Sequence, residues 1–286
     1  MSDEAQRQAA AADQFAIEVD GLRKVYHVSK AGGRGRVDVV AVDDVTFSVA
    51  PGRSLAIVGE SGSGKTTTAR MIMGLEQPTA GRIVFGGVER AHGRLGSRER
   101  RRYGREIQIV FQDPFSSLDP RQRVGDAIDE VIKLHFNQSS AERTARVAGL
   151  LDQVGLDERH GRALPRALSG GQQQRVAIAR ALASMPKVLI LDEAVASLDV
   201  SIQAQVLNLL ADIREETGVT YLFISHDLAV VRQVSDDVIV MRRGQIVERG
   251  PTATVLDQPK DSYTKTLLSA VPRRGWKPQR HRTVAD

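Results

Sequence analysis

Residues 59–66 read GESGSGKT, and this stretch decides the fold. It matches the pattern G-x-x-x-x-G-K-[ST] in full. The apolar run 54–58 before it predicts a buried strand, and residues 65–73 predict a helix that stops at Gly74. A glycine-rich loop between a strand and a helix binds phosphate, because its backbone N–H groups converge on oxygen atoms at the positive end of the helix. An incidental glycine-rich turn is the alternative, and the order of strand, loop and helix argues against it.

The loop predicts ATP and Mg²⁺ as ligands. Lys65 is long enough to reach the β- and γ-phosphates, and the Thr66 hydroxyl can ligate Mg²⁺. The ATP-binding residues expected from the loop are Gly59, Glu60, Ser61, Gly62, Ser63, Gly64, Lys65, Thr66 and Thr67.

A second motif supplies the acidic residues that such a site needs. The apolar run 188–191 predicts a buried strand, and Asp192 and Glu193 follow it directly. Ligands bind at the carboxyl ends of strands in open parallel sheets, so Asp192 is expected to help hold Mg²⁺. Glu193 is in place to orient or deprotonate the attacking water as a general base. The alternative, a strand end with two solvated acids, is less well supported beside the lysine loop.

The rest of the chain predicts an α/β fold with an antiparallel β part and a helical part. Alternating apolar residues at 16–19 and 39–49 indicate antiparallel strands. Residues 126–183 carry a helical pattern, with runs at 141–154 and 172–183. The apolar run 221–224 predicts another parallel strand, which a helix over 201–216 separates from 188–191. Beyond Gly250, prolines and basic residues indicate an extension that ends in a disordered tail.

Composition limits the class of protein. The 286 residues are 41% hydrophobic and 26% charged, as in a globular protein with a sizeable core. No apolar run approaches the roughly 20 residues of a membrane-spanning helix. Residues 1–14 contain acidic residues and no apolar segment, so we expect a disordered lead-in, not a secretory signal, and a cytoplasmic location. The lack of cysteine excludes disulfides and cysteine-ligated metal centres.

Basic residues gather in two segments of a chain whose net charge is +5. One segment, 94–105, contains Arg98, Arg100, Arg101 and Arg102, and the other covers 273–282. A charge run of this kind indicates either a solvated loop and a solvated tail or a contact with lipid headgroups or a partner subunit.

A third motif indicates the protein family. Residues 168–172 read LSGGQ, in which Ser169 can cap the following helix while Gly170 and Gly171 leave N–H groups open to an anion. A plain helix cap explains Ser169 alone, but not the motif's place between a nucleotide loop and a carboxylate strand. With these motifs the chain resembles the ABC (ATP-binding cassette) ATPase family, in which LSGGQ is the signature motif.

The resemblance implies a P-loop NTPase (RecA-like) core with an antiparallel β subdomain and a helical subdomain that carries the signature. It covers residues 15–250, with the helical subdomain at about 113–175, between the lead-in 1–14 and the C-terminal extension 251–286. It also implies further site residues: Tyr26 for adenine stacking, Gln112 as a catalytic residue and Mg²⁺ ligand, Asp199 in the D-loop, and His226 as the catalytic switch histidine. A lone tyrosine or histidine is more often structural, so these assignments depend on their order along the chain.

One departure from the family pattern follows Glu193. The family usually has Pro-Thr there, whereas this chain has Ala194, Val195 and Ala196 before Ser197. The turn therefore lacks the fixed φ of proline. The charged and metal-binding positions are unchanged, so we expect activity to survive.

The family architecture also implies partners. The signature of one cassette completes the ATP site of another, with the signature residues Ser169, Gly170, Gly171 and Gln172 facing the partner's ATP. A single set of motifs then requires a second cassette, either an identical or a related chain. The resemblance further implies two membrane-spanning permease subunits at the cytoplasmic face of the membrane, which an extracytoplasmic solute-binding protein serves indirectly.

Two stretches indicate the branch of the family. Residues 111–121, FQDPFSSLDPR, and the run 263–272 are similar to the oligopeptide and dipeptide importers. Importers of nickel, glutathione and other small solutes belong to the same branch and remain alternatives. A soluble ABC ATPase would more often carry two cassettes or a coiled-coil insertion. A nucleic-acid partner is not expected, because aromatic residues are only 4% of the chain and form no stacking platform.

Overall fold

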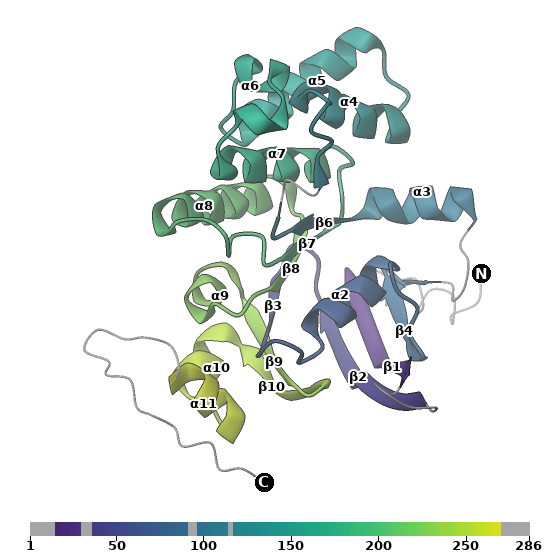
Figure 1. Ribbon diagram of the computed structural model, residues 1–286, viewed down its shortest axis with the longest axis vertical. Coiled ribbons are helices and arrows are strands. Elements are labelled where there is room, and N and C mark those ends of the chain that lie inside the picture. The colour runs from purple at the N-terminus through teal and green to yellow at the C-terminus, as the bar shows by residue number, and fades with distance from the viewer. Residues whose placement is uncertain (1–14, 30–35, 91–95, 114–116, 270–286) are drawn as a thin grey trace, which may run out of the picture.

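The computed structural model describes residues 15–29, 36–90, 96–113 and 117–269, and the central layer of these residues is a six-stranded sheet (Figure 1). Its strands are β3 (Ser54–Val58), β6 (Ile107–Phe111), β7 (Val188–Asp192), β8 (Thr220–Ile224), β9 (Asp237–Arg242) and β10 (Gln245–Pro251). They lie in the order β10-β9-β3-β8-β7-β6. All are parallel except β10, which pairs with β9 in the antiparallel sense.

The central strands are buried on both faces. Every residue of β3, β7 and β8 is buried, as is typical of parallel strands that are covered on both sides. Leu55 and Ile57 belong to one hydrophobic core, and Ala56 and Val58 belong to the other. The sheet therefore separates two cores.

The first core joins the sheet to a second, antiparallel sheet of order β2-β1-β4-β5. This sheet consists of β1 (Ile17–Ser29), β2 (Arg36–Val49), β4 (Ala80–Phe85) and β5 (Val88–Glu89). Helix α2 (Lys65–Met73) contributes Ala69, Met71 and Ile72 to the same core. The helix that follows the glycine-rich loop is thus held between the two sheets.

The second hydrophobic core lies between the central sheet and a group of helices. Figure 1 shows α4 (Val124–His135), α5 (Ser140–Gln153), α6 (Glu158–Arg162) and α7 (Gly170–Leu182) gathered at one end of the molecule, followed by α8 (Val200–Thr217) and α9 (Leu228–Val234). A short 3₁₀ turn, η2 (Pro165–Ala167), leads into α7. The predicted α/β class, with an antiparallel β part and a helical part, is confirmed.

From Ser97 the basic segment 94–105 lies in a helix, α3 (Ser97–Glu106), so the loop expected there is wrong for these residues. Arg98, Arg100, Arg101 and Arg102 are exposed. Tyr103 is buried, with its ring centroid 6.5 Å from that of Phe85. This one apolar anchor fixes the helix to the antiparallel sheet while the arginines face outward.

Two further helices form in the C-terminal segment where only an extension was expected. Helices α10 (Thr252–Asp257) and α11 (Ser262–Ser269) bury Val255, Leu256, Tyr263 and Leu268 in the second core. The predicted lead-in 1–14 and the basic tail from Arg273 onward lie outside the described residues. No helix in the described ranges is long and apolar enough to cross a bilayer.

Candidate functional site

The predicted site residues meet at one edge of the six-stranded sheet. Phe111 at the end of β6 pairs with Asp192, Asp192 pairs with Ile224, and Ile224 pairs with Ile57 near the end of β3. The residues that continue each strand are Gln112, Glu193, His226 and the loop 59–66. Carboxyl ends of parallel strands are the usual ligand-binding edge of such a sheet.

Close packing explains two of the loop glycines. Gly59 and Gly64 have φ values of 149° and 104°. A Cβ atom on Gly59 would lie 2.2 Å from the carbonyl oxygen of Met241, and one on Gly64 would lie 2.5 Å from that of Ala41. Larger residues are therefore excluded at both positions, and the loop is held against β9 and β2.

Lys65 lies inside the loop that it is predicted to serve. Its Nζ donates hydrogen bonds to the carbonyl oxygens of Gly59 (2.7 Å) and Glu60 (2.9 Å). Burial lowers the pKa of Lys65, while the nearby carboxylates of Glu193, Asp192 and Glu60 act in the opposite direction. A buried ammonium beside a helix N-terminus attracts anions strongly, because little water screens it.

Other groups around the loop suit a triphosphate and Mg²⁺. The Ser63 hydroxyl is buried and has no hydrogen-bond partner among the described residues. Burial and the neighbouring Glu193 raise the pKa of Asp192, which a bound cation would counteract. Thr66, Asp192 and Gln112 offer the oxygen ligands that Mg²⁺ prefers. The described residues include no cluster of three or more acidic or histidine side chains that could hold a metal alone.

Glu193 has a strained backbone. Its φ of 50° lies in the left-handed region that side chains other than glycine rarely adopt. The conformation is held by Glu193 N–H, which donates to the carbonyl oxygen of Ile224 (2.8 Å). It allows Glu193 Oε1 to meet Nδ1 of His226 at 3.1 Å. Strain of this kind persists where the surroundings enforce it, and it clusters at functional sites.

The turn after Glu193 is held without proline. Ala196 N–H donates to the Glu193 carbonyl oxygen (3.0 Å), and Leu198 N–H donates to that of Val195 (3.3 Å). Ala194 and Val195 are buried in the second core. Packing and hydrogen bonds thus take over the restraint that Pro-Thr would supply.

The D-loop connects Gln112 to α8. The Ser197 hydroxyl donates to the carbonyl oxygen of Gln112 (3.2 Å). Asp199 caps α8 by accepting from Ile202 N–H (3.0 Å), and this bond and one from Ser201 lower the pKa of Asp199. Part of the branch-specific stretch, residues 114–116, lies outside the described residues.

Tyr26 lies beside the first turn of α2. Burial and the nearby Glu76 side chain raise the pKa of its hydroxyl, while the nearby Thr67 side chain acts in the opposite direction. The Nζ atom of Lys24 lies 5.0 Å from the centroid of the Tyr26 ring. The ring is thus close to the loop at Thr67, and its role in adenine stacking stays a prediction.

The signature motif lies apart from the loop, at the start of α7 in the helical end of the molecule (Figure 1). Ser169 Oγ accepts from the N–H of Gln172 (3.3 Å), and Gln172 Oε1 accepts from the N–H of Ser169 (2.9 Å). Ser169 and Gly170 are exposed. Gly171 is restricted, because a Cβ there would lie 2.5 Å from Cγ2 of Ile202. The motif therefore presents its polar groups to solvent instead of to the loop of its own chain.

Sequence reasoning missed a side chain that hydrogen-bonds the loop. Tyr263 of α11 is buried, and its hydroxyl accepts a hydrogen bond from the N–H of Glu60 (3.1 Å). The guanidinium of Arg242 lies 4.8 Å from the centroid of its ring. The similarity of residues 263–268 to the importer branch marked this position, but nothing in the local pattern predicted its contact with the loop.

A cavity of about 670 Å³ lies at the opposite edge of the sheet. Ile107, Val188 and Thr220, the first residues of β6, β7 and β8, line it. None of the predicted site residues does so. The polar groups that converge at the carboxyl edge therefore make that edge the better candidate for chemistry.

Comparison with known proteins gives consistent results. Residues 42–196 match the family model described as ABC transporter. A "Glutathione import ATP-binding protein GsiA" of Escherichia coli O157:H7 is 50% identical over 235 residues, which is 82% of this chain and 37% of that protein. The protein of the same name from Salmonella paratyphi A is 48% identical over 245 residues, 86% of this chain and 39% of that protein. The chain therefore spans about two fifths of the length of these curated relatives.

Solved structures share the fold. A dimeric structure of the ATP-binding cassette MJ0796 bound to ADP and Pi superposes with a TM-score of 0.71 and 29% identity, and it covers 82% of this chain and 98% of that one. The structure of cbiO1 from Clostridium perfringens, part of the ABC transporter complex cbiONQ, gives a TM-score of 0.74 and 28% identity over 86% of this chain and 92% of that one. The chain accordingly belongs to the ABC transporter family.

Proposed function

We propose that this chain binds ATP and Mg²⁺ at the loop 59–67 and hydrolyses ATP as the energy-supplying subunit of an importer. The observation that carries the proposal is the strained Glu193, which meets His226 beside the buried pair Lys65 and Asp192. A carboxylate that is held against its conformational preference, next to a site for phosphate, suits a general base.

The chain's own residues divide the task. Lys65, the Ser63 hydroxyl and the N–H groups at the start of α2 bind the β- and γ-phosphates. Thr66, Asp192 and Gln112 hold Mg²⁺, which when bound neutralises negative charge on the phosphates. Glu193 takes the proton of the attacking water, and His226 holds the Glu193 side chain in place.

A second cassette completes the arrangement. The exposed Ser169 and Gly170 face away from the chain's own loop, and the MJ0796 cassette crystallised as a dimer. We propose that the signature of this chain contacts ATP bound to an identical or related cassette. Two membrane-spanning subunits would bind this pair at the cytoplasmic face of the membrane, where an extracytoplasmic binding protein delivers the solute to them.

The proposed solute is a peptide. The two branch-specific stretches support oligopeptides or dipeptides, and the names of the relatives support glutathione, which is itself a tripeptide. Uptake of labelled dipeptide, oligopeptide, glutathione and nickel by cells with and without the chain separates these solutes. We expect loss of peptide or glutathione uptake, and loss of nickel uptake alone contradicts the assignment.

Co-purification tests the broader proposal. The tagged full chain is expected to retain membrane subunits and a second cassette, and the complex is expected to hydrolyse ATP in the presence of Mg²⁺. Retention of nucleic acid without membrane subunits would favour the rejected class of nucleic-acid-binding ATPase.

Replacing Tyr263 with Phe is expected to weaken ATP binding by roughly twofold to tenfold, as the loss of one buried hydrogen bond predicts. The N–H of Glu60 loses its acceptor, so the start of the loop is less firmly held, while the ring keeps its place over Arg242. ATP affinity of the chain is measured by titration calorimetry.

The matched control is Tyr221→Phe. The Tyr221 hydroxyl donates to the carbonyl oxygen of Leu210 (2.8 Å) and is also buried, but it is not in the loop. We expect that variant to lose stability and keep its ATP affinity. Equal affinities in the two variants would show that Tyr263 does not act on the loop.

Replacing Arg98, Arg100, Arg101 and Arg102 with Gln is expected to leave the hydrolysis rate close to that of wild type. All four are exposed on α3, which is anchored through Tyr103, and exposed charges act mainly through salt-screened surface contacts. Steady-state hydrolysis by the assembled complex, at low and high salt, is the measurement. A large loss of basal hydrolysis in a complex that still assembles would place this helix in the chemistry.

A further inference from the structure

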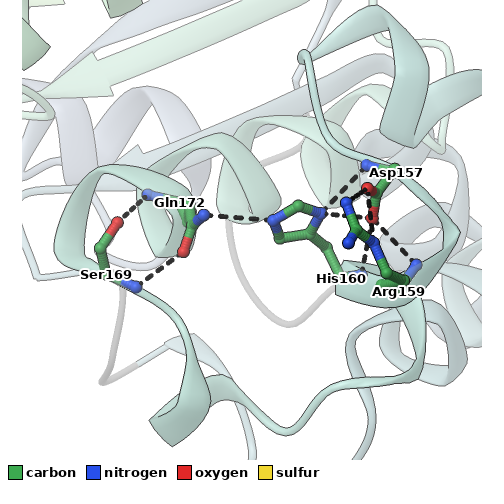
Figure 2. Close-up of polar contacts among 5 residues, drawn as sticks. All are labelled: Asp157, Arg159, His160, Ser169 and Gln172. Carbon is green, nitrogen blue, oxygen red and sulfur yellow. Dashed lines mark hydrogen bonds and ion pairs between the residues drawn. The ribbon is translucent and has the colours of Figure 1, made fainter.

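His160 of α6 contacts the signature motif from a neighbouring helix (Figure 2). Its Nε2 lies 3.1 Å from Nε2 of Gln172, and its Nδ1 lies 2.7 Å from Oδ1 of Asp157. The imidazole therefore bridges the Ncap residue of α6 and the third residue of α7.

The hydrogen bonds fix the direction of this bridge. Gln172 Oε1 accepts from Ser169 N–H, so the amide NH₂ of Gln172 faces His160. An NH₂ group only donates, so the ring Nε2 must accept and the ring proton lies on Nδ1, where it is donated to Asp157. The N–H of Asp157 also lies 3.1 Å from Nδ1. The opposite tautomer, with the ring proton on Nε2, would satisfy only the contact with the N–H of Asp157. It would place two donors face to face at Gln172 and two acceptors face to face at Oδ1 of Asp157.

Asp157 is a firm anchor for the ring. Its Oδ2 accepts from Nη2 (2.7 Å) and Nε (3.0 Å) of Arg159, and its Oδ1 accepts from the N–H groups of Arg159 (2.9 Å) and His160 (3.2 Å). These bonds, led by that from the Arg159 side chain, hold the pKa of Asp157 well below its usual range. The acceptor for the Nδ1 proton is therefore ionised and fixed in place.

The bridge has a consequence for Ser169. The Gln172 side chain accepts a hydrogen bond from the N–H of Ser169, and the N–H of Gln172 donates one to the Ser169 hydroxyl oxygen. The hydroxyl proton and the first N–H groups of α7 then remain for an external anion. A Gln172 side chain without its partner on His160 has other rotamers available, and each of them releases Ser169.

We propose that His160 is a positioning residue of the signature motif, which orients Gln172 so that Ser169 and Gly170 face the γ-phosphate of ATP on the second cassette. The inference rests on the proposed function, since it assumes that the signature serves a partner's ATP. His160 acts through Gln172, so it is not a catalytic residue. Its contribution is expected in the association of two cassettes and not in binding of ATP to its own chain.

Three substitutions separate the two contacts of the ring. In His160→Gln, the side-chain amide lies at the distance of the ring Nε2, so its carbonyl oxygen can accept from Gln172 while the contact with Asp157 is lost. In His160→Asn, the shorter side chain reaches only the position of Nδ1 and keeps the contact with Asp157. His160→Ala removes both contacts. The Gln and Asn variants are therefore a matched pair that differ in the contact with the signature.

The variants are measured in the full chain, assembled with its second cassette and permease subunits. The Asn and Ala variants are expected to hydrolyse ATP roughly threefold to tenfold more slowly, as loss of one oriented hydrogen bond predicts, while the Gln variant keeps most of the wild-type rate. In the Glu193→Gln background, ATP-dependent association of the cassettes is expected to weaken by a similar factor for Asn and Ala. ATP affinity of the separate chain is expected to stay unchanged in all variants, because loop 59–67 is untouched.

Equal rates and equal association for the Gln and Asn variants would overturn the proposal, since the contact with Gln172 would then have no effect. Weakened ATP binding to the separate chain in each variant would also overturn it, because the substitutions would then act on the fold. A wild-type chain that neither binds ATP nor associates in its presence would instead refute the proposed function.

Discussion

The Glu193→Gln variant is expected to bind ATP and Mg²⁺ normally while its hydrolysis rate falls by roughly 10²- to 10⁴-fold, the range typical of the loss of a general base. Gln has the size of Glu and keeps an oxygen for His226 Nδ1, which lies 3.1 Å from Oε1 in the wild type. It cannot accept the proton of the attacking water. ATP then remains bound and unhydrolysed, so the contact between the two cassettes is expected to persist.

The companion substitution Asp192→Asn tests whether the two adjacent carboxylates differ in role. Asp192 is buried, and burial and Glu193 raise its pKa. A cation bound beside this carboxylate favours its charged form, so the loss of the charge in Asn is expected to weaken cation binding. We expect weaker Mg²⁺ and nucleotide binding, and no persistent association of cassettes. ATP affinity, hydrolysis and cassette association are measured for both variants with the second cassette present. Wild-type hydrolysis by Glu193→Gln, or failure of that variant to bind ATP, would refute the assigned role.

The sequence predicts the parts of this fold that local patterns determine. The strand before the loop and the helix after it occur at Ser54–Val58 and Lys65–Met73, as predicted. The loop motif requires a helix after it, and a central parallel strand must be apolar on both faces. These two requirements leave few alternative secondary structures for the flanking segments. The same holds for β7, because acidic residues that end an apolar run indicate the edge of a sheet.

Contacts between distant segments could not be predicted in this way. The hydrogen bond from Glu60 to Tyr263 joins residues 203 positions apart. Helices α10 and α11 form because Val255, Leu256, Tyr263 and Leu268 pack into the second core, whereas the local composition, with its prolines and basic residues, indicated only an extension. Tertiary packing overrides weak local preferences in such segments.

The site shows the same limit. Glu193 is predicted from the acidic end of an apolar run and His226 from its order along the chain, but the left-handed backbone that joins them depends on the bond from Glu193 N–H to Ile224 in the neighbouring strand. The bridge from His160 to Gln172 likewise depends on how α6 packs beside α7. Motifs therefore identify the chemical groups, and the sheet and the helical part determine their orientation.

The Lys65→Ala variant is expected to lose productive use of ATP altogether. The ammonium is buried and donates to the carbonyl oxygens of Gly59 and Glu60, so it sits where the phosphates are expected to bind. Alanine removes the cation that compensates charge on the β- and γ-phosphates. Removal of one preorganised donor costs about 10²- to 10³-fold in rate, and the loss of a full charge at a water-poor position is expected to exceed that.

Steady-state hydrolysis and ATP affinity of the assembled complex are the measurements, with Lys133→Ala as the matched control. Lys133 is exposed on α4, so its removal changes the net charge by the same amount without touching the loop. We expect the control to match wild type and Lys65→Ala to fall to background in a complex that still assembles and melts cooperatively. The Ser63 hydroxyl and the N–H groups at the start of α2, which remain in this variant, would then be insufficient without the cation. Unchanged hydrolysis by Lys65→Ala would show that loop 59–66 is not an active nucleotide site, and the roles given to Asp192 and Glu193 would fall with it, because both depend on a triphosphate held in this loop.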